Sequence, residues 1–305
     1  MTAQLIDGKR IAAEIRAEVA ERTRALAERG IRPGLGVVLV GDDPASHVYV
    51  RMKTRACEEA GIYARDIAPP ADIGRAELLG IVDELNADPA IHGILVQLPL
   101  PRHLDEREVT ERIDPAKDVD GFHPVNQGRM SQGDASAFRP ATPAGVQELI
   151  RRTGVETSGA HVVIVGRSNI VGMPMSQIML QKEPGANATV TVAHSRTADL
   201  GAVTRQGEIL IVAVGVPGIV RGDMVREGAV VIDVGVNRVE DPTTERGYRL
   251  VGDVAFDEAA ERASWITPVP GGVGPMTIAM LLRNTVRSAE RTASLAAAGA
   301  VAASS

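Results

Sequence analysis

The sequence is short of several residue types, and each shortage narrows what the chain can be. Its 305 residues include one cysteine, Cys57, so a disulfide framework within the chain is excluded and a reducing compartment is favoured. No apolar run is as long as a transmembrane helix, and residues 1–9 do not form a signal peptide. These absences predict a cytoplasmic protein with no membrane partner.

An excess of positive charge is also missing. The formal net charge is -6 at pH 7, which argues against nucleic acid as a partner. Hydrophobic residues make up 44% and charged residues 24% of the chain, as in ordinary globular proteins. A chain of 305 residues is long enough for about two domains, each with its own core.

Lysine and aromatic residues are scarce too, and this draws attention to one pair. Only four of the 33 basic residues are lysines (Lys9, Lys53, Lys117 and Lys182), and aromatic residues make up 2% of the chain. Because arginine supplies charge elsewhere, a lysine indicates a place where an amine that can lose its proton is useful. Lys53 follows Tyr49 by four residues in the stretch SHVYVRMK, residues 46–53. A half-buried ring beside a solvated charge is the alternative interpretation.

The first half of the chain alternates between predicted strands and helices. An apolar run at residues 35–40 predicts a buried strand, followed by a turn and a helix that starts at Ser46 and stops at Gly61. On this helix Tyr49 and Lys53 share one face, near the strand's carboxyl edge, where open α/β sheets bind ligands. Further helices are predicted at 11–29 and 75–86, and further strands at 61–67 and 91–101. This alternation predicts a parallel sheet covered by helices.

Two further polar residues are candidates in this half. Gln97 lies where the strand at 91–101 ends, and its amide can orient Lys53 through a hydrogen bond. A capping or solvent-exposed glutamine is the alternative. Asp120 lies in the segment DPAKDVDGF, residues 114–122, where its carboxylate can bind two N–H groups of a ligand. The alternative is a polar turn, because Asp, Pro and Gly are common in turns. A calcium-binding loop is disfavoured, because it requires a different spacing of its ligands.

A polar, Gly- and Ser-rich segment at residues 127–137 marks the predicted boundary between domains. After a helix at 144–152, the strand that begins at His161 leads into the turn GRSNIVG, residues 166–172, in the order expected of a dinucleotide site. The glycine fingerprint is incomplete, because Ser168 occupies the place of the second glycine. Buried strands predicted at 188–193, 209–214 and 229–234 strengthen the assignment.

The residues after the strand at 188–193 predict the cofactor. An NAD site usually has an acid there, whereas an NADP site accommodates the extra phosphate with arginine. Ser195 and Arg196 follow this strand, and the first acid is Asp199. Ser195 and Arg196, joined by Arg167, are suited to bind phosphate, which favours NADP. A solvated loop is the alternative.

A glycine-rich loop at residues 268–274 precedes a helix predicted to run to about residue 286. Such a loop is either an anion or carbonyl site or a tight turn. The Ala- and Ser-rich tail after residue 291 is predicted to be frayed or disordered.

Five blocks of this sequence resemble one family. They are PASHVYVRMK at 44–53, GILVQLPLP at 93–101, KDVDGF at 117–122, GRSNIVGMP at 166–174 and PVPGGVGPMT at 268–277. From about residue 5 to 286 the chain is similar to bifunctional methylenetetrahydrofolate dehydrogenase/methenyltetrahydrofolate cyclohydrolase. The resemblance implies NADP-dependent oxidation of 5,10-methylenetetrahydrofolate to 5,10-methenyltetrahydrofolate, and then hydrolysis to 10-formyltetrahydrofolate. Ala141 and Ala255 depart from the family pattern, but neither residue belongs to the implied chemistry.

The resemblance also implies a fold and residue roles. The fold class is α/β, with two α/β domains flanking a cleft, usually in a homodimer. A folate-binding catalytic domain at 1–138 is joined by the C-terminal helix at 279–305, and a Rossmann-like NADP-binding domain spans 139–278. Tyr49 stacks on the folate, Lys53 is the catalytic amine, Gln97 is its partner and Asp120 anchors the pterin. The further substrate contacts that the resemblance implies are Val96, Leu98, Pro270, Gly271, Gly272, Val273 and Gly274. The cofactor contacts that it implies are Gly166, Arg167, Ser168, Ser195, Arg196 and Val236. It implies no metal.

Two alternatives from other classes remain. A Tyr-x-x-x-Lys pair with a nucleotide fold also suggests a short-chain NADP-dependent carbonyl reductase that uses Tyr49 and Lys53. In that class the glycine turn precedes the pair, whereas Gly166 lies more than a hundred residues after Lys53. A nucleotide-sensing module without catalysis would not need Lys53, Gln97 and Asp120.

Overall fold

The computed structural model describes residues 3–245 and 247–303, which form two compact units. The six-stranded unit comprises Met1–Ala12, Met130–Ala135 and Thr142–Thr277, and the three-stranded unit comprises Ala13–Arg129, Ser136–Ala141 and Ile278–Ser305. Four helices contribute residues to both units: α1 (Gly8–Ala27), α5 (Pro124–Ser131), α6 (Ala141–Thr153) and α10 (Val273–Ala303).

The three-stranded unit is built on a parallel sheet in the order β3-β2-β4. Strands β2 (Gly34–Val38) and β4 (Gly93–Val96) are buried at every position, and the third strand is β3 (Tyr63–Ile67). Parallel strands covered on both faces are continuously apolar, which explains why β2 and β4 are recognisable in the sequence. Helices α2 (Pro44–Glu59) and α3 (Arg75–Ala87) make the connections, and α4 (Glu106–Arg112) packs against α3.

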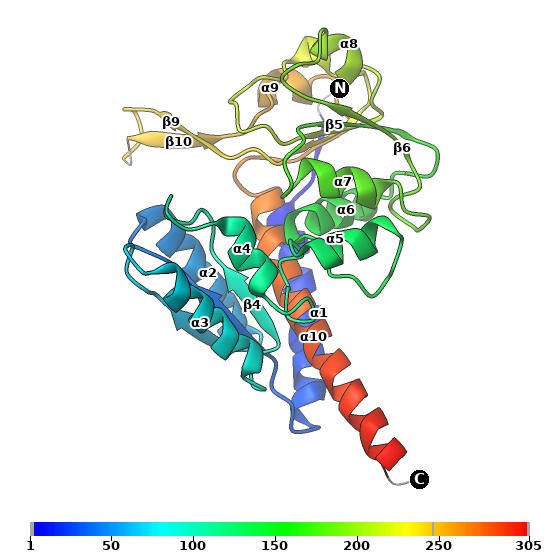
Figure 1. The fold of residues 1–305 in the computed structure, drawn as a ribbon. Helices are drawn as coiled ribbons and strands as arrows, with labels where there is room; N and C mark the ends of the chain where they lie inside the picture. Colours follow the sequence, from blue (N-terminus) through cyan, green and yellow to red (C-terminus); the bar gives the residue numbers. More distant parts are fainter. Residues whose placement is uncertain (1–2, 246, 304–305) are drawn as a thin grey trace. The chain divides into compact units, whose positions relative to one another are not determined.

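Helix α10 completes this unit. Figure 1 shows α1 and α10 side by side, and the Arg22 guanidinium donates to the Glu290 carboxylate over 2.6 Å. The Asn284 amide of α10 donates to the carbonyl of Val119 over 2.8 Å, next to the segment that carries Asp120. The last helix of the chain therefore fixes a loop from the first half.

The six-stranded unit contains a fully parallel sheet in the order β1-β11-β8-β7-β5-β6. Its strands are β1 (Gln4–Leu5), β5 (His161–Val165), β6 (Thr189–Ala193), β7 (Ile209–Val212), β8 (Val230–Asp233) and β11 (Trp265–Ile266). Short helices α7 (Gly172–Met179), α8 (Leu200–Thr204), η1 (Gly222–Met224) and α9 (Phe256–Ala260) lie along it. The strand order reverses beside β5, so a ligand crevice is expected at the carboxyl ends of β5 and β7.

A hairpin of β9 (Asn237–Glu240) and β10 (Tyr248–Val251) follows β8 and is absent from the sequence prediction. Figure 1 shows it projecting from the six-stranded unit. Its side chains are only partly buried or exposed, and Arg238 stacks on the Tyr248 ring at 3.9 Å from the centroid. A strand pair without a buried face has little hydrophobic pattern, which explains why the sequence did not reveal it.

The structure corrects four details of the sequence prediction. Helix α2 starts at Pro44 and is capped by Asp43, so Ser46 is not its first residue. The predicted linker at 127–137 begins inside α5. Helix α10 continues to Ala303, because an alanine-rich segment favours helix over disorder. Strand β1 pairs with β11, which places residues 4–5 in the six-stranded sheet and not in the first domain.

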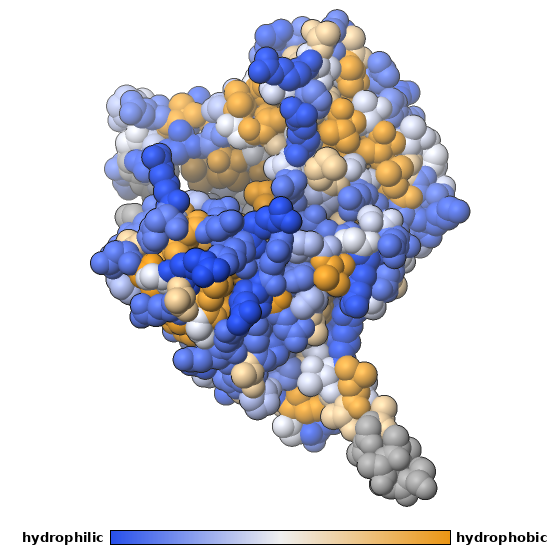
Figure 2. Space-filling model, in the orientation of Figure 1, coloured by the Kyte–Doolittle hydropathy of each residue, from blue (hydrophilic) through white to orange (hydrophobic). Residues whose placement is uncertain are grey.

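Within the described residues, no helix is both long and apolar enough to cross a membrane. Figure 2 shows mainly hydrophilic residues in the lower part of the visible face and larger groups of apolar residues in its upper part.

Candidate functional site

The first candidate site lies on helix α2. The Asp43 carboxylate accepts a hydrogen bond from the backbone N–H of Ser46 over 2.8 Å, and a proline follows the cap, which is a favourable helix start. Tyr49 and Lys53 therefore lie one turn apart on the same face of α2. The Tyr49 side chain is 48% exposed, unusually open for an aromatic ring. Such a ring offers an apolar surface on which a flat ligand can stack.

Lys53 and Gln97 form a direct contact. The Lys53 ammonium donates to Gln97 Oε1 over 2.9 Å, while Gln97 Nε2 donates to the carbonyl of Leu98 over 2.7 Å. The backbone N–H of Gln97 also donates to the carbonyl of Val38, over 2.8 Å, extending the pairing of β4 with β2. These bonds fix the orientation of the Gln97 amide so that its oxygen faces the lysine. Val96, the last residue of β4, is buried beneath them.

The electrostatic environment brings Lys53 closer to its neutral form. Burial lowers the pKa of Lys53 from its ordinary value, although the charges of Asp120 and Cys57 oppose this change. An amine of lowered pKa can act as a base or proton carrier near neutral pH.

Asp120 is the carboxylate partner of this environment. Burial raises the pKa of Asp120 to about 6; the Lys53 charge lowers it and the Asp118 charge raises it further. The pKa values of Lys53 and Asp120 are therefore closer together than those of a free lysine and a free aspartic acid. Two groups with pKa values displaced towards neutrality by burial are typical of a catalytic site.

A second aspartate in the same segment, Asp118, was missed by the sequence analysis. It is buried and accepts four hydrogen bonds: from the backbone N–H groups of residues 121, 122 and 123, over 3.1, 3.2 and 2.9 Å, and from the Asn126 amide, over 2.8 Å. These bonds hold the loop that carries Asp120. The signal was present in the block KDVDGF, but nothing local distinguishes the supporting aspartate, Asp118, from the candidate site residue, Asp120.

Lys117 begins the same block and supports α3. Its ammonium donates to three carbonyls at the end of that helix, those of Leu85, Asn86 and Asp88, over 3.1, 2.8 and 2.8 Å. A helix leaves its last carbonyls without partners, and a cation there satisfies them. Lys117 is thus a structural residue, in contrast to Lys53.

The second candidate site lies at the carboxyl edge of the six-stranded sheet. Gly166 ends β5 with φ of +128°, and a Cβ there would lie 2.2 Å from the carbonyl oxygen of Ala213. A Cβ on Gly172 would lie 2.2 Å from the carbonyl oxygen of Gly166. The turn is therefore restricted to glycine at both ends, and it leads into the N-terminus of α7. Arg167 and Ser168 lie between them, exposed, as a dinucleotide's phosphates require.

The loop after β6 carries Ser195 and Arg196, both exposed. It is tightened by hydrogen bonds from the Arg196 N–H to His194 Nδ1, 3.1 Å, and from the His194 N–H to Thr197 Oγ1, 2.9 Å. Asp199 is used elsewhere, because it caps α8 by accepting from the Ala202 N–H over 2.8 Å. In this part of the described chain, the end of β6 therefore carries the basic side chain of Arg196 and not the acid that is typical of an NAD site.

Val236 and the glycine-rich loop complete the predicted set in the six-stranded unit. Val236 follows β8 and is 47% exposed, which is unusual for a valine beside a sheet. The loop from Pro270 to Gly274 leads into α10 and has Gly271 at φ +114°, with the Lys9 side chain against it. Val273 is buried as the first residue of α10. This loop belongs to a different compact unit from Tyr49, Lys53, Gln97 and Asp120.

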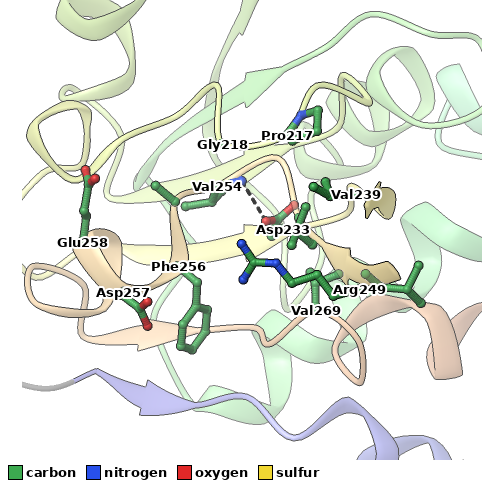
Figure 3. A pocket seen from close by; sticks show the side chains of 14 residues that line it. Pro217, Gly218, Asp233, Val239, Arg249, Val254, Phe256, Asp257, Glu258 and Val269 are labelled. Atoms are coloured by element: carbon green, nitrogen blue, oxygen red, sulfur yellow. Dashed lines mark hydrogen bonds between the residues drawn. The ribbon is translucent and has the colours of Figure 1, made fainter. Parts of the chain in front are cut away.

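A pocket of about 550 Å³ lies beside the end of β8 (Figure 3). Arg249, Phe256 and Glu258 are among its lining residues, and Asp233 lies at its base with a hydrogen bond from the backbone of Val254. None of the predicted site residues lines it. Among the described residues, no group of three or more His, Cys, Asp or Glu side chains is arranged to hold a metal ion.

Comparisons with known proteins cover both units. Residues 6–120 match a model of the tetrahydrofolate dehydrogenase/cyclohydrolase catalytic domain, and residues 140–293 match its NAD(P)-binding domain. The bifunctional protein FolD of Moorella thermoacetica is 57% identical over 291 residues, covering 95% of this chain and 100% of that protein.

Solved structures agree. The bifunctional FolD enzyme of Campylobacter jejuni is 48% identical with a TM-score of 0.90, covering 95% of this chain and 99% of that one. The methylenetetrahydrofolate dehydrogenase-cyclohydrolase of Trypanosoma brucei, complexed with NADP and an inhibitor, is 42% identical with a TM-score of 0.91. The match covers 96% of this chain and 99% of that one.

Proposed function

The chain belongs to the tetrahydrofolate dehydrogenase/cyclohydrolase family, and we infer that it is a bifunctional enzyme of folate one-carbon metabolism. It oxidises 5,10-methylenetetrahydrofolate to 5,10-methenyltetrahydrofolate with NADP, and it hydrolyses that product to 10-formyltetrahydrofolate. The full-length relationship favours this function over a short-chain carbonyl reductase or a nucleotide sensor.

NADP is the cofactor that the six-stranded unit suits. When bound, NADP accepts the hydride in the oxidation. The tight turn from Gly166 to Gly172 leaves room for a pyrophosphate at the N-terminus of α7, and Arg167 and Ser168 lie along it. Ser195 and Arg196, both exposed after β6, are assigned to the 2′-phosphate, and the exposed Val236 is assigned an apolar contact. The related Trypanosoma brucei structure, which contains NADP, supports this choice.

The single observation that carries the residue assignment is the hydrogen bond between Lys53 and Gln97, beside a carboxylate of raised pKa. Tyr49 stacks on the folate, and Asp120 accepts hydrogen bonds from the N–H edge of the pterin. Val96 and Leu98, which flank Gln97 in the three-stranded unit, are the further substrate contacts. During hydride loss no side chain has to accept a proton, so these residues act by positioning.

Hydrolysis makes a further demand on the protein. Water adds to the methenyl carbon and loses a proton, and one carbon–nitrogen bond of the ring then breaks as that nitrogen gains a proton. Lys53 is proposed to carry this proton, because burial lowers its pKa and Gln97 holds its ammonium in one direction.

We also propose that the three-stranded unit, joined by α10, holds the folate and that the six-stranded unit holds NADP. The resemblance to the family supports association of two copies into a homodimer, which light scattering on the purified protein would test. The single, buried free thiol of Cys57 is consistent with a cytoplasmic location.

One assay tests the function. Purified protein is given 5,10-methylenetetrahydrofolate with NADP or NAD, and the formation of reduced cofactor and of methenyltetrahydrofolate is followed; hydrolysis is then measured from methenyltetrahydrofolate alone. We expect both reactions, with NADP preferred. Absence of NADP-dependent oxidation in folded protein would contradict the proposal.

A further inference from the structure

Two buried aspartates lie at the carboxyl edge of the six-stranded sheet, outside every predicted site. Asp233 ends β8, and its side chain accepts hydrogen bonds from the backbone N–H groups of Gly235, Asp253 and Val254, over 3.0, 3.0 and 2.8 Å. Figure 3 shows the bond from Val254. The backbone of Asp233 is in turn fixed, because its N–H donates to Thr267 Oγ1 over 2.8 Å. Asp233 thus holds the segment that carries Asp253 against the end of the sheet.

Asp253 is fully buried and holds two other loops. Its Oδ2 accepts from the backbone N–H groups of Val214 and Gly215, over 2.7 and 2.9 Å. Its Oδ1 accepts from the Asn237 amide over 2.8 Å. One carboxylate therefore joins the loop after β7, which borders the switch point where a dinucleotide is expected, to the start of β9 after β8.

The backbone is shaped around both carboxylates. A Cβ on Gly235 would lie 2.2 Å from the Asp253 carboxyl group, and a Cβ on Gly252 would lie 1.8 Å from Asp233 Oδ2. Each aspartate thus occupies space that a side chain would otherwise fill. Both oxygens of each carboxylate accept hydrogen bonds, five in all from backbone N–H groups and one from the Asn237 amide.

The loops held in this way carry two exposed apolar residues. Val236 lies between Gly235 and Asn237, both of which are bound to an aspartate, and it is 47% exposed. Val216, next to Gly215, is 46% exposed. An exposed valine can contact a ligand reproducibly only if its backbone is fixed before the ligand arrives.

We propose that Asp253, supported by Asp233, is a positioning residue for NADP: it joins the loops after β7 and β8 and so holds Val236 where the dinucleotide contacts it. This inference rests on the proposed function, since it assumes that the six-stranded unit binds NADP. Asp253 does not touch the cofactor. Its effect is to preorganise the site, so its loss should weaken binding of NADP without affecting hydrolysis of methenyltetrahydrofolate, which needs no cofactor.

The test combines NADP affinity by isothermal titration calorimetry with the hydrolase rate and the thermal unfolding midpoint. Asp253→Ala removes the carboxylate that accepts three hydrogen bonds and should raise the Kd for NADP at least tenfold, while the hydrolase kcat/KM stays within twofold. Asp253→Asn keeps the shape, and a rotated Asn237 amide can accept from it, so its Kd should stay within about threefold. The matched control is Asp223→Ala, an exposed aspartate of the same unit, which should leave all three readouts unchanged.

Asn237→Ala provides the test if Asp253→Ala does not fold, because it cuts only the link to the segment of Val236. The Kd for NADP should then rise about fivefold with hydrolysis retained. If either folded variant binds NADP as well as the wild type, or if binding and hydrolysis fall by the same factor, the positioning role is wrong. If the wild type itself binds no NADP, the proposed function is what fails.

Discussion

At the scale of single residues, the proposed chemistry depends on an amine and a carboxyl group with displaced pKa values. Burial lowers the pKa of Lys53 and raises that of Asp120 to about 6, while their mutual attraction opposes both changes. Desolvation is the larger effect for each group. Filling the site with a flat ligand excludes more water and strengthens this effect.

Replacing Lys53 should separate the two activities. Lys53→Met keeps the apolar stem, so oxidation should survive in measurable amount, whereas hydrolysis should fall about 100- to 10,000-fold, the range that a proton carrier contributes. Lys53→Arg keeps the charge but cannot lose the proton, so it should not restore hydrolysis. Both rates are measured on the same preparation, with Lys182→Met as the control for an exposed lysine. Equal losses in both reactions would mean that Lys53 only positions the substrate.

Asp120 should set the acid limit of both reactions. Its pKa of about 6 means that the carboxylate predominates above pH 6 and is protonated below it, which removes one of the two acceptors proposed for the pterin. We expect kcat/KM of the wild type to fall as the pH is lowered through 6. Asp120→Asn should lower both activities together, and its kcat/KM should no longer fall as the pH is lowered through 6. Either activity close to the wild-type level at saturating folate would make Asp120 a turn residue.

Arg196 should decide between the cofactors. Charge-assisted hydrogen bonds are worth about 1.5–3 kcal/mol, so Arg196→Ala should raise KM for NADP by roughly tenfold or more and leave KM for NAD nearly unchanged. Steady-state measurements with both cofactors check this. An equal change for the two cofactors would remove Arg196 from the 2′-phosphate site.

At the scale of elements, Lys117 stabilises the end of α3 and thereby the block that carries Asp120. Lys117→Met leaves three carbonyls without their donor and should lower the free energy of unfolding by about 2 kcal/mol. Urea denaturation measures the change. Lys182→Met, on the surface of the other unit, should change it by less than about 0.5 kcal/mol. A Lys117→Met protein as stable as the control would show that water replaces the ammonium without cost.

Elements with a hydrophobic pattern were predictable, and those without one were not. Strands such as β5 and β7 are buried on both faces and are found as apolar runs. The hairpin of β9 and β10 buries no face, and α5 contains Gly and polar residues whose helical state depends on tertiary contacts. The contact of Lys53 with Gln97 agrees with the sequence hypothesis. Asp118, Asp233 and Asp253 escaped it, because an aspartate satisfied by backbone N–H groups has no local signature.

At the scale of the whole molecule, the buried aspartates make stability depend on pH. Burial, together with the neighbouring charge of Asp253, raises the pKa of Asp233 to about 7, although three backbone N–H donors oppose this. Between pH 4 and 7 the folded state therefore retains a proton that the unfolded state loses, so this group lowers the free energy of unfolding as the pH rises, by at most about 4 kcal/mol.

Asp253→Asn should reduce this dependence, because it removes the charge that helps to raise the pKa of Asp233. Urea denaturation at pH 4.5 and 7.5 should show a smaller loss of stability with rising pH in the variant than in the wild type. Titrating groups other than these two aspartates are present in both proteins and cancel in the comparison. Identical pH dependence in the two proteins would mean that Asp233 is ionised throughout.

Each unit is assembled from segments that are far apart in the sequence, and this has a consequence for synthesis on the ribosome. Strand β1 is translated first, yet its partner β11 lies at Trp265–Ile266. The carbonyl of Val119 likewise has no donor until Asn284 of α10 has been made. Domains that are continuous in sequence can fold one after another as they emerge. Here the six-stranded unit cannot be completed before β11 has left the exit tunnel, nor the three-stranded unit before Asn284 has, so the apolar strands made earlier stay without their partners for most of translation.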